Sequence, residues 1–332
     1  MNNLNKKKIL VTGGLGFIGI NLVLKLLNHD YEILNIDYQT YAANKKFKSK
    51  LNSFKNYSFA KIDICNQKKV EKAINDFCPA YIFHLAAESH VDNSINNAKI
   101  FLDTNIYGTY NLLESVKNYQ IKKKKKITFH HISTDEVYGS LLENDRKFSE
   151  KSNYDPSSPY SSSKASSDML VKSWGKTHDI EFIITHCSNN YGPFQNKEKF
   201  IPKIISSCIK KNIIPVYGNG KNIRDWIYVS DHIDALIAIL NSSIRNTTLN
   251  IGGNLELENL ELVNNICSIY TKNFEPNFNF KSLIKFVADR PGHDLRYAVN
   301  NRRIKKLLGW RPMTNFDEGI LNTIKWYQQE DV

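Results

Sequence analysis

A tyrosine and a lysine four residues apart, Tyr160 and Lys164, form one pair in the sequence that could do acid–base chemistry. On a helix this spacing places the phenol and the ammonium group on one face. A neighbouring ammonium favours the phenolate, which can take the proton of an alcohol while a hydride leaves the adjacent carbon. The spacing is common by chance, so it indicates alcohol oxidation only if a hydride acceptor binds nearby.

Thr134, Asp135 and Glu136 form a second reactive group. They follow the strand-like run 127–133, and the carboxyl ends of strands are where open α/β sheets bind ligands. Consecutive carboxyl groups are costly to desolvate unless they are used, and one can be held protonated by the other. Alcohol oxidation does not need them, so they predict a second proton transfer, such as an elimination. The alternative is an exposed acidic turn or a helix N-cap.

A glycine-rich turn predicts where the hydride acceptor binds. Gly13, Gly16 and Gly19 lie between the first strand and the first helix, where they allow a tight turn and close approach of a pyrophosphate to backbone N–H groups. Asp37 ends the second strand, about twenty residues further on, where a carboxylate accepts ribose hydroxyls and repels a 2′-phosphate. This favours NAD over NADP. The alternative is a structural glycine turn with a surface aspartate.

The elements that must position these residues alternate between strand and helix. We expect strands at 8–12, 32–37, 58–61, 81–85, 127–133 and 181–187, and helices at 17–27, 68–77, 101–119 and 160–177. This pattern predicts an α/β protein with a doubly wound, parallel Rossmann-type sheet. Turn clusters after residue 188 indicate a smaller, loop-rich C-terminal substrate lobe. We therefore expect domains 1–187 and 188–332, the first completed by segments within 225–255.

Composition narrows the class of protein further. The 332 residues are 41% hydrophobic, which is typical of a folded globular chain. The net charge of +12 raises the question of nucleic acid, but the lysine run 122–126 lacks interleaved aromatics and is interpreted as a solvated loop. Five widely spaced cysteines without a C-x-x-C pair disfavour a metal site or a disulfide scaffold. Without an apolar stretch of about eighteen residues, we expect no membrane partner and a cytoplasmic location.

The sequence resembles the extended short-chain dehydrogenase/reductase superfamily and, within it, the dTDP-glucose 4,6-dehydratase family. The matching stretches run nearly end to end, at 12–19, 41–44, 84–92, 130–139, 157–168, 187–193, 215–228, 250–253, 289–297 and 308–312. The Asp-Glu pair in 131–139 is the most specific feature, since related epimerases and decarboxylases lack it. Plant-type UDP-glucose dehydratases share these motifs, so the motifs do not decide whether the nucleotide base of the substrate is thymine or uracil. Asn93 and residues 195–198 depart from the family pattern.

The resemblance implies a complete reaction, in which dTDP-glucose becomes dTDP-4-keto-6-deoxyglucose and NAD is recycled. Tyr160, helped by Lys164, would take the proton of the glucose 4-hydroxyl, which Thr134 also holds, while hydride passes to NAD. Glu136 would then remove the C5 proton and Asp135 would protonate the 6-hydroxyl, so that water leaves. Hydride would return to C6, and Glu136 would reprotonate C5.

The resemblance also assigns binding residues. The cofactor residues would be Gly13, Gly16, Phe17, Ile18, Gly19, Asp37, Asp63, Ile64, Leu85, Ala86, Ala87, Ser89, Thr104, Tyr160, Lys164 and Asn190. The substrate residues would be Ser89, Thr134, Asn189, Lys199, Pro215, Tyr217, Arg224, Asn259, Arg290 and His293. The two arginines suit phosphate oxygens, and their alternative is a surface ion pair with Asp225 or Asp289.

A homodimer is implied as well, through a four-helix interface formed by helices 101–119 and 160–177. Leu112, Leu113, Val116, Met169 and Leu170 fit outward apolar faces, but helices packed on their own sheet would look the same.

Two other functions remain as alternatives. One is a nucleotide-sugar epimerase or decarboxylase of the same superfamily, and the other is a non-catalytic dinucleotide-sensing or scaffold protein.

Overall fold

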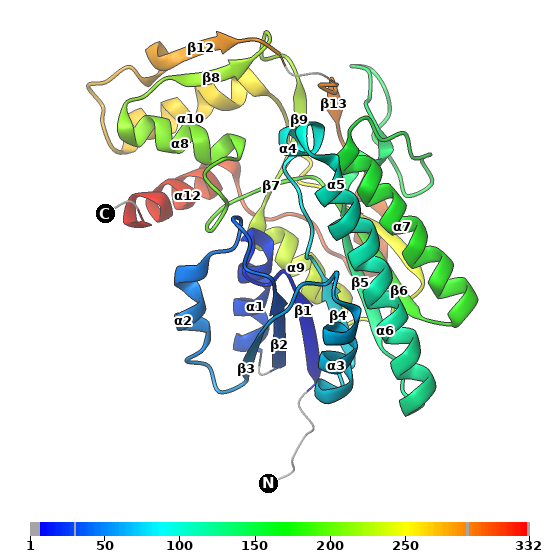
Figure 1. Ribbon diagram of the computed structural model, residues 1–332. Coiled ribbons are helices and arrows are strands. Elements are labelled where there is room, and N and C mark those ends of the chain that lie inside the picture. The colour runs from blue at the N-terminus through cyan, green and yellow to red at the C-terminus, as the bar shows by residue number, and fades with distance from the viewer. Residues whose placement is uncertain (1–6, 30, 290–291, 331–332) are drawn as a thin grey trace. The chain divides into compact units, whose positions relative to one another are not determined.

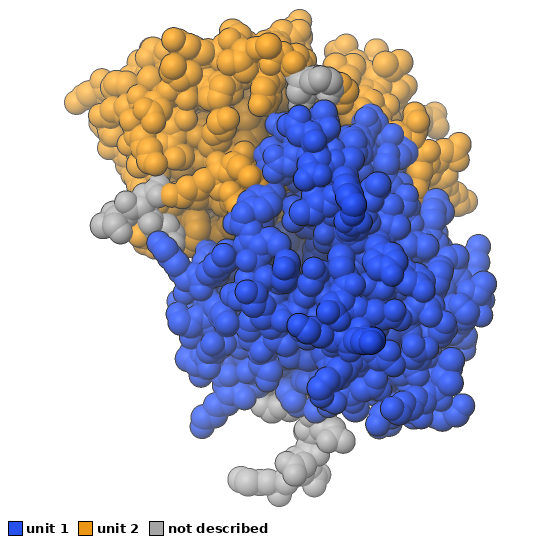
Figure 2. All heavy atoms as spheres, viewed as in Figure 1, with its two compact units in different colours: residues 1–137, 156–186, 241–249 blue, residues 138–155, 187–240, 250–332 orange. Residues whose placement is uncertain are grey.

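The computed structural model describes residues 7–29, 31–289 and 292–330 (Figure 1). The chain divides into two compact units, coloured separately in Figure 2. Unit 1 takes in residues 1–137, 156–186 and 241–249, and unit 2 takes in 138–155, 187–240 and 250–332. The segment 138–155 lies in unit 2, although the sequence placed it in the first domain, before the boundary at 187. It groups with unit 2 because Leu141 and Phe148 form bridges to Arg296 and Val299.

Unit 1 is built on a seven-stranded sheet with the order β10-β6-β5-β4-β1-β2-β3. The strands are β1 (Lys8–Thr12), β2 (Glu32–Asp37), β3 (Tyr57–Lys61), β4 (Tyr81–His84), β5 (Thr128–Thr134), β6 (Glu181–Cys187) and β10 (Thr247–Ile251). β1 pairs in parallel with both β2 and β4, and the chain order reverses there. Ligands bind outside such a switch point in doubly wound sheets. The predicted fold class is confirmed, and the six predicted strands end within one residue of these bounds.

Helices flank the sheet of unit 1. They are α1 (Phe17–Asn28), α2 (Lys48–Leu51), α3 (Gln67–Phe77), α4 (Val91–Asn96), α5 (Ala98–Phe101), α6 (Gly108–Lys123) and α7 (Pro159–His178), and α6 and α7 run side by side (Figure 1). α7 begins at Pro159 after a capping box between Ser158 and Ser161. Leu112, Leu113 and Val116 are buried in the core of this unit, so these three residues do not form an outward face.

One predicted helix differs from the structure. The expected helix 101–119 is interrupted by a π-helical segment, η2 (Leu102–Tyr107), between α5 and α6. Within it, Asn105 accepts from the backbone N of Glu88 at 2.9 Å and donates to the backbone O of Glu88 at 3.0 Å. Its amide also donates to Oγ of Ser163 at 2.8 Å. The wider turn thus lets one buried side chain tie this segment to α7, which apolar periodicity cannot reveal.

In the part of unit 2 that the structure describes, short strands are combined with four helices of more than two turns. Its elements are β7 (Asn189–Tyr191), α8 (Phe200–Lys210), β8 (Ile214–Tyr217), β9 (Ile223–Tyr228), α9 (Val229–Leu240), β11 (Glu256–Glu258), α10 (Asn259–Asn273), β12 (Ile284–Val287), β13 (Arg296–Tyr297), α11 (Arg302–Leu308) and α12 (Phe316–Glu330). α8, α10 and α12 enclose a core that includes Ile204, Ile266 and Tyr327. Across the described residues of both units, no helix is both long and apolar enough to cross a bilayer.

Replacing Gly19 should destabilise unit 1. A Cβ there would lie 2.2 Å from the O of Gly13 and 2.7 Å from the Cα of Gly14, and both contacts are backbone. We expect Gly19→Ala to lower the free energy of unfolding by at least about 1–3 kcal/mol, measured by urea denaturation. Gly16→Ala is the matched control, because its nearest contact is 3.3 Å away and its φ is −75°. Equal losses in the two variants would contradict the close packing.

Candidate active site

The turn that joins β1 to α1 has the shape of a phosphate cradle. Gly13 has a φ of +72°, donates its N–H to Ile36 at 2.8 Å, and leaves so little room that a Cβ would lie 2.7 Å from the N of Ala86. Gly16 is the N-cap of α1 and supplies no side-chain cap. An uncapped helix N-terminus presents backbone N–H groups to an anion. The backbone here therefore fits a pyrophosphate.

Asp37 lies at the end of β2 beside this turn. Its Oδ2 accepts from the N–H of Leu15 at 3.0 Å and its Oδ1 accepts from the N–H of Gln39 at 2.7 Å. Burial raises the pKa of the Asp37 carboxyl, and the two backbone hydrogen bonds partly oppose this rise. The carboxylate is thus held at the carboxyl edge of the sheet, where a dinucleotide's ribose hydroxyls are bound in folds of this kind.

A cavity of about 510 Å³ opens in unit 1 around these groups. It is lined by residues that follow β1, β2, β3 and β4 and by one side of η2. The predicted cofactor residues in its lining are Gly13, Gly16, Asp37, Asp63, Ile64, Leu85, Ala86, Ala87 and Thr104. Seven predicted cofactor residues are not among those that line the cavity. Six of them lie elsewhere in unit 1, namely Phe17, Ile18, Gly19, Ser89, Tyr160 and Lys164, and the seventh, Asn190, lies in unit 2.

Several lining residues were missed by the sequence reasoning. They are Ile36, Tyr38, Thr40, Ala42, Ala43, Ile62, Cys65, Ile100, Asp103 and Tyr107, whereas Glu88 falls in the matching stretch 84–92. Two signals could have found some of them. Ala42 and Ala43 fall in the matching stretch 41–44. Ile100 lies four residues before Thr104 and Tyr107 three residues after it, so that on a helix both share its face.

The acidic pair lies at the end of β5, as predicted. Thr134 ends the strand, and Asp135 begins the short 3₁₀ helix η3 (Asp135–Tyr138). The hydroxyl of Thr134 donates to Oδ1 of Asp135 at 3.4 Å and accepts the N–H of Glu136 at 3.3 Å. Asp135 is only 1% exposed, which excludes the alternative of an exposed acidic turn for this residue. Glu136 is half-buried.

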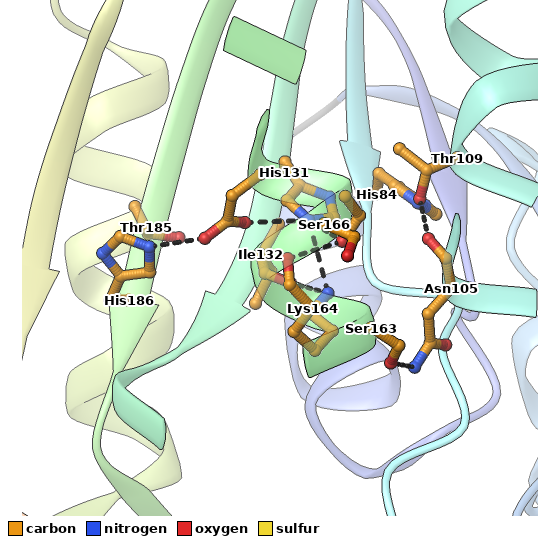
Figure 3. Close-up of polar contacts among 12 residues, drawn as sticks. His84, Asn105, Thr109, His131, Ile132, Ser163, Lys164, Ser166, Thr185 and His186 are labelled. Carbon is orange, nitrogen blue, oxygen red and sulfur yellow. Dashed lines mark hydrogen bonds and ion pairs between the residues drawn. The ribbon is translucent and has the colours of Figure 1, made fainter. Parts of the chain in front are cut away.

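Tyr160 and Lys164 lie one turn apart on α7, and both are buried. Nζ of Lys164 donates to the O of Ile132 at 2.8 Å and lies 3.4 Å from Nε2 of His131, so the side chain points to β5 (Figure 3). Ile132 precedes Thr134 by two residues. The lysine therefore joins the tyrosine-bearing helix to the strand end that carries the acidic pair.

This arrangement supports two kinds of proton transfer. A tyrosine beside a fixed ammonium can act as a base toward an alcohol. Asp135 is buried and Glu136 is half-buried, so the two carboxyl groups stand in different surroundings, as the two members of an acid–base pair do. Unit 1 thus holds a cofactor cradle and all five predicted catalytic residues.

The predicted substrate residues from Asn189 to His293 belong to unit 2. The Oδ1 atoms of Asn189 and Asn259 are buried without a hydrogen-bond partner, which is unusual unless a ligand supplies the donor. Asn190 is satisfied within unit 2, because it donates to the O of Ser188 at 3.0 Å and contacts His232 at 2.9 Å.

Arg224 is not a surface residue. It is 5% exposed, and its guanidinium lies 4.3 Å from the centre of the Tyr297 ring. It donates to the backbone O of Ile223 at 2.7 Å and of Asp294 at 3.0 Å. Burial excludes the alternative of a surface ion pair with Asp225.

Four further predicted substrate residues are described in unit 2, namely Lys199, Pro215, Tyr217 and His293. Tyr217 ends β8, which also carries Pro215, and packs edge-on against the ring of His293 at 6.4 Å between centroids. Nδ1 of His293 lies 2.6 Å from Oδ1 of Asp289. Lys199 is the N-cap of α8. Arg290 lies outside the described residues.

Curated proteins similar to this chain share one enzyme name. A dTDP-glucose 4,6-dehydratase from Haemophilus influenzae is 46% identical over 96% of this chain and 97% of its own length. The dTDP-glucose 4,6-dehydratase 1 of Escherichia coli K12 is 43% identical over 96% of this chain and 92% of its own length.

Solved structures agree with these relatives. A dTDP-glucose 4,6-dehydratase from Bacillus anthracis, in complex with NAD, superimposes with a TM-score of 0.87 at 39% identity and covers 98% of this chain and 97% of its own. A UDP-glucose 4-epimerase from Thermotoga maritima reaches 0.86 at only 25% identity, covering 98% and 100%. The fold alone therefore does not separate the two activities, whereas sequence identity does.

The sequence model of the family described as GDP-mannose 4,6 dehydratase matches residues 10–323. This match includes the glycine turn from Gly13 onwards, the acidic pair and the Tyr160–Lys164 face. By this match and by its relatives, the chain belongs to the nucleotide-sugar 4,6-dehydratase family and, within it, to the dTDP-glucose 4,6-dehydratases.

Proposed function

We propose that this chain removes water from dTDP-glucose to form dTDP-4-keto-6-deoxyglucose. The observation that carries the proposal is the hydrogen bond from Lys164 to Ile132, which links the Tyr160 helix to the strand end bearing Asp135 and Glu136. Identity of 46% to a dTDP-glucose 4,6-dehydratase over nearly the whole chain supports the substrate.

NAD is the cofactor, and the residues present fit it. The glycine turn excludes a Cβ at Gly13, Asp37 offers an acceptor at the end of β2, and the cavity has a volume of about 510 Å³. Gly13, Gly16, Asp37, Asp63 and Thr104 would hold the cofactor. When bound, NAD would supply reversible hydride transfer, by which C4 of the sugar is oxidised and C6 is later reduced.

The first step is the oxidation of C4. Tyr160, as the phenolate, takes the proton of the 4-hydroxyl, and the hydroxyl of Thr134 holds the same oxygen. The ammonium of Lys164 is fixed by Ile132 one turn from the phenol, so it stabilises the negative charge of Tyr160 before the proton moves.

The second step is the loss of water. The C4 carbonyl makes the C5 proton acidic, and Glu136 takes it as a carboxylate. Asp135 gives its proton to the 6-hydroxyl, so that the oxygen leaves as water and a C5–C6 double bond forms. Glu136 then returns the proton to C5 as C6 is reduced, which restores its carboxylate.

The substrate's nucleotide diphosphate is bound by residues of unit 2. The buried Oδ1 atoms of Asn189 and Asn259 can accept from the ligand, and Tyr217 offers a ring to the base. Lys199 and Arg224 supply the positive charge that a diphosphate requires, and His293 adds a ring nitrogen that can form a hydrogen bond. Pro215, Arg290 and, in unit 1, Ser89 complete the set by their match to the family pattern.

The protein works as a homodimer in the cytoplasm. Leu102 on η2 and Met169 on α7 are 46% and 50% exposed, and these two elements pack on each other. Large exposed apolar side chains on adjacent helices favour self-association.

The cytoplasmic location is supported by the cysteines. Those described are all free, which suits a reducing compartment.

Incubation with dTDP-glucose should yield a product that is lighter by one water. Purified protein is given dTDP-glucose or, separately, UDP-glucose, without and with added NAD, and the products are followed by mass spectrometry. We expect dehydration of the thymidine nucleotide and little of the uridine one. Stronger dehydration of UDP-glucose would show that uridine is the preferred nucleoside. If neither nucleotide sugar loses water, the dehydratase proposal is overturned.

Glu136→Gln should block water loss without blocking oxidation. The amide cannot take the C5 proton, so we expect the rate of dehydration to fall by about 10²–10⁴-fold while reduced nicotinamide accumulates. Single-turnover absorbance and mass spectrometry measure the two steps. Tyr160→Phe is the comparison variant and should give neither product. Wild-type dehydration by Glu136→Gln would remove this residue from the mechanism.

Charges placed on the exposed helix face should separate the dimer. We expect light scattering to give about twice the chain mass of 38.3 kDa for the wild type and a single chain for the variant Leu102→Glu, Met169→Glu. Met313→Glu is the control, because Met313 is 70% exposed but belongs to unit 2. A monomeric wild type would refute the dimer.

A further inference from the structure

Helix α7 carries a third charged or reactive residue on the face of Tyr160 and Lys164. Asp168 follows Lys164 by four residues, so the three side chains lie in one row. Their exposed fractions fall along the helix from 8% through 4% to 0%. Because this helix packs on β5, the row leads from the reacting phenol into the core of unit 1.

The Asp168 carboxylate lies between two histidines of adjacent strands. Its Oδ2 lies 2.8 Å from Nε2 of His186 on β6, and its Oδ1 lies 3.3 Å from Nε2 of His131 on β5. Burial by itself raises the pKa of Asp168, but His186 and His131 outweigh burial, so the pKa is lowered. Asp168 is therefore ionised, which places a negative charge in the core.

His131 lies between this charge and Lys164. Its Nε2 lies 3.4 Å from Nζ of Lys164 and 3.2 Å from the hydroxyl of Ser167, whereas its Nδ1 is buried without a partner. Burial, followed by the charge of Lys164, lowers the pKa of His131 to about 4, so the ring is neutral at neutral pH. Nζ of Lys164 thus lies within about 7 Å of the Asp168 carboxylate, a range over which charges interact strongly in a protein interior.

We propose that Asp168 is a positioning residue for Lys164, in which the carboxylate orients His131 and supplies the negative charge that keeps the buried ammonium protonated. The inference rests on the role of Lys164 in the proposed function. A lysine buried to this extent needs a counter-charge, and Asp168 provides one on the side away from the phenol. The protonated Lys164 can then stabilise the phenolate of Tyr160 before that phenolate takes the proton of the 4-hydroxyl.

A metal site is the obvious alternative for two histidines and a carboxylate. Among the described residues, no three His, Cys, Asp or Glu side chains are grouped so that they could hold a metal ion. The histidines instead contact different oxygens of Asp168, which is the arrangement of an anchored carboxylate.

Among the described residues, groups of three elements lie near Lys164. Asp168 lies on its own helix, with Tyr160 one turn away. His131 faces it from β5, and the charge of Lys164 also helps to lower the pKa of His84 on β4 after burial. Of these groups Asp168 is the carboxylate, so its replacement by an amide should lower the pKa of Lys164.

The test uses Asp168→Asn, which keeps the shape of the side chain and removes its charge. The full-length protein is labelled with ¹³C at the lysine Cε, and Lys164 is assigned by its loss in Lys164→Arg. We expect the apparent pKa of Lys164 to fall by about one unit or more in Asp168→Asn. This nuclear magnetic resonance titration needs neither substrate nor turnover. An unchanged titration of Lys164 in a folded variant would overturn the proposal.

Two histidine variants provide a matched comparison that does not depend on Asp168→Asn folding. His130 and His131 are neighbours on β5 and are both fully buried, but His130 contacts Tyr81 at 2.8 Å and Thr185 at 3.2 Å instead of Lys164. We expect His131→Asn to slow single-turnover oxidation of the sugar at least tenfold at unchanged KM, and His130→Asn to lower only the melting temperature. Equal losses of rate in the two variants would show a merely structural role.

Failure of the inference and failure of the proposed function give different results. A wild type that dehydrates no nucleotide sugar refutes the function, while the lysine titration in Asp168→Asn still decides the role of Asp168. Conversely, normal dehydration with an unmoved titration refutes the role of Asp168 and leaves the function intact.

Discussion

An ammonium group inside a protein core must be given hydrogen-bond acceptors and a compensating charge, and Lys164 imposes this requirement on unit 1. The acceptor is the carbonyl of Ile132, so fixing the ammonium also fixes α7 against β5. Tyr160 lies one turn from the lysine and Thr134 lies two residues beyond the carbonyl. The same contact therefore sets the helix that carries the phenol against the strand end that carries the acidic pair.

A second buried polar chain supports the cofactor side of the sheet. The hydroxyl of Thr12 on β1 accepts the N–H of Ala86 at 3.2 Å and contacts His84 on β4 at 2.8 Å. His84 in turn contacts the hydroxyl of Thr109 on α6 at 2.9 Å. Burial lowers the pKa of His84 well below its usual value, so a neutral ring bridges these hydroxyls. The glycine turn thus follows a strand whose end is tied to β4 and, through His84, to α6.

Much of this architecture follows from local patterns in the chain. The alternation of short apolar strands with helices predicted six strands to within one residue, because buried strands and amphipathic helices have different periods. Glycine spacing predicted the cradle, since only glycine allows the backbone approaches at Gly13 and Gly19. The π-helical segment at Asn105 was not predicted, because it depends on bonds to Glu88 and Ser163, which lie elsewhere in the sequence.

The sequence by itself determined the reacting groups. Tyr160 and Lys164 share a face because four residues make about one helical turn, and Asp37 stands at a sheet edge because it ends a strand next to the first. Only the tertiary structure decided what those groups touch. Three contacts depend on which strand a helix packs against. Leu112 faces the core, Asp168 lies between His131 and His186, and Lys164 contacts Ile132. The physical reason is that packing and charge compensation join residues far apart in the chain, whereas local spacing records only the face on which each residue lies.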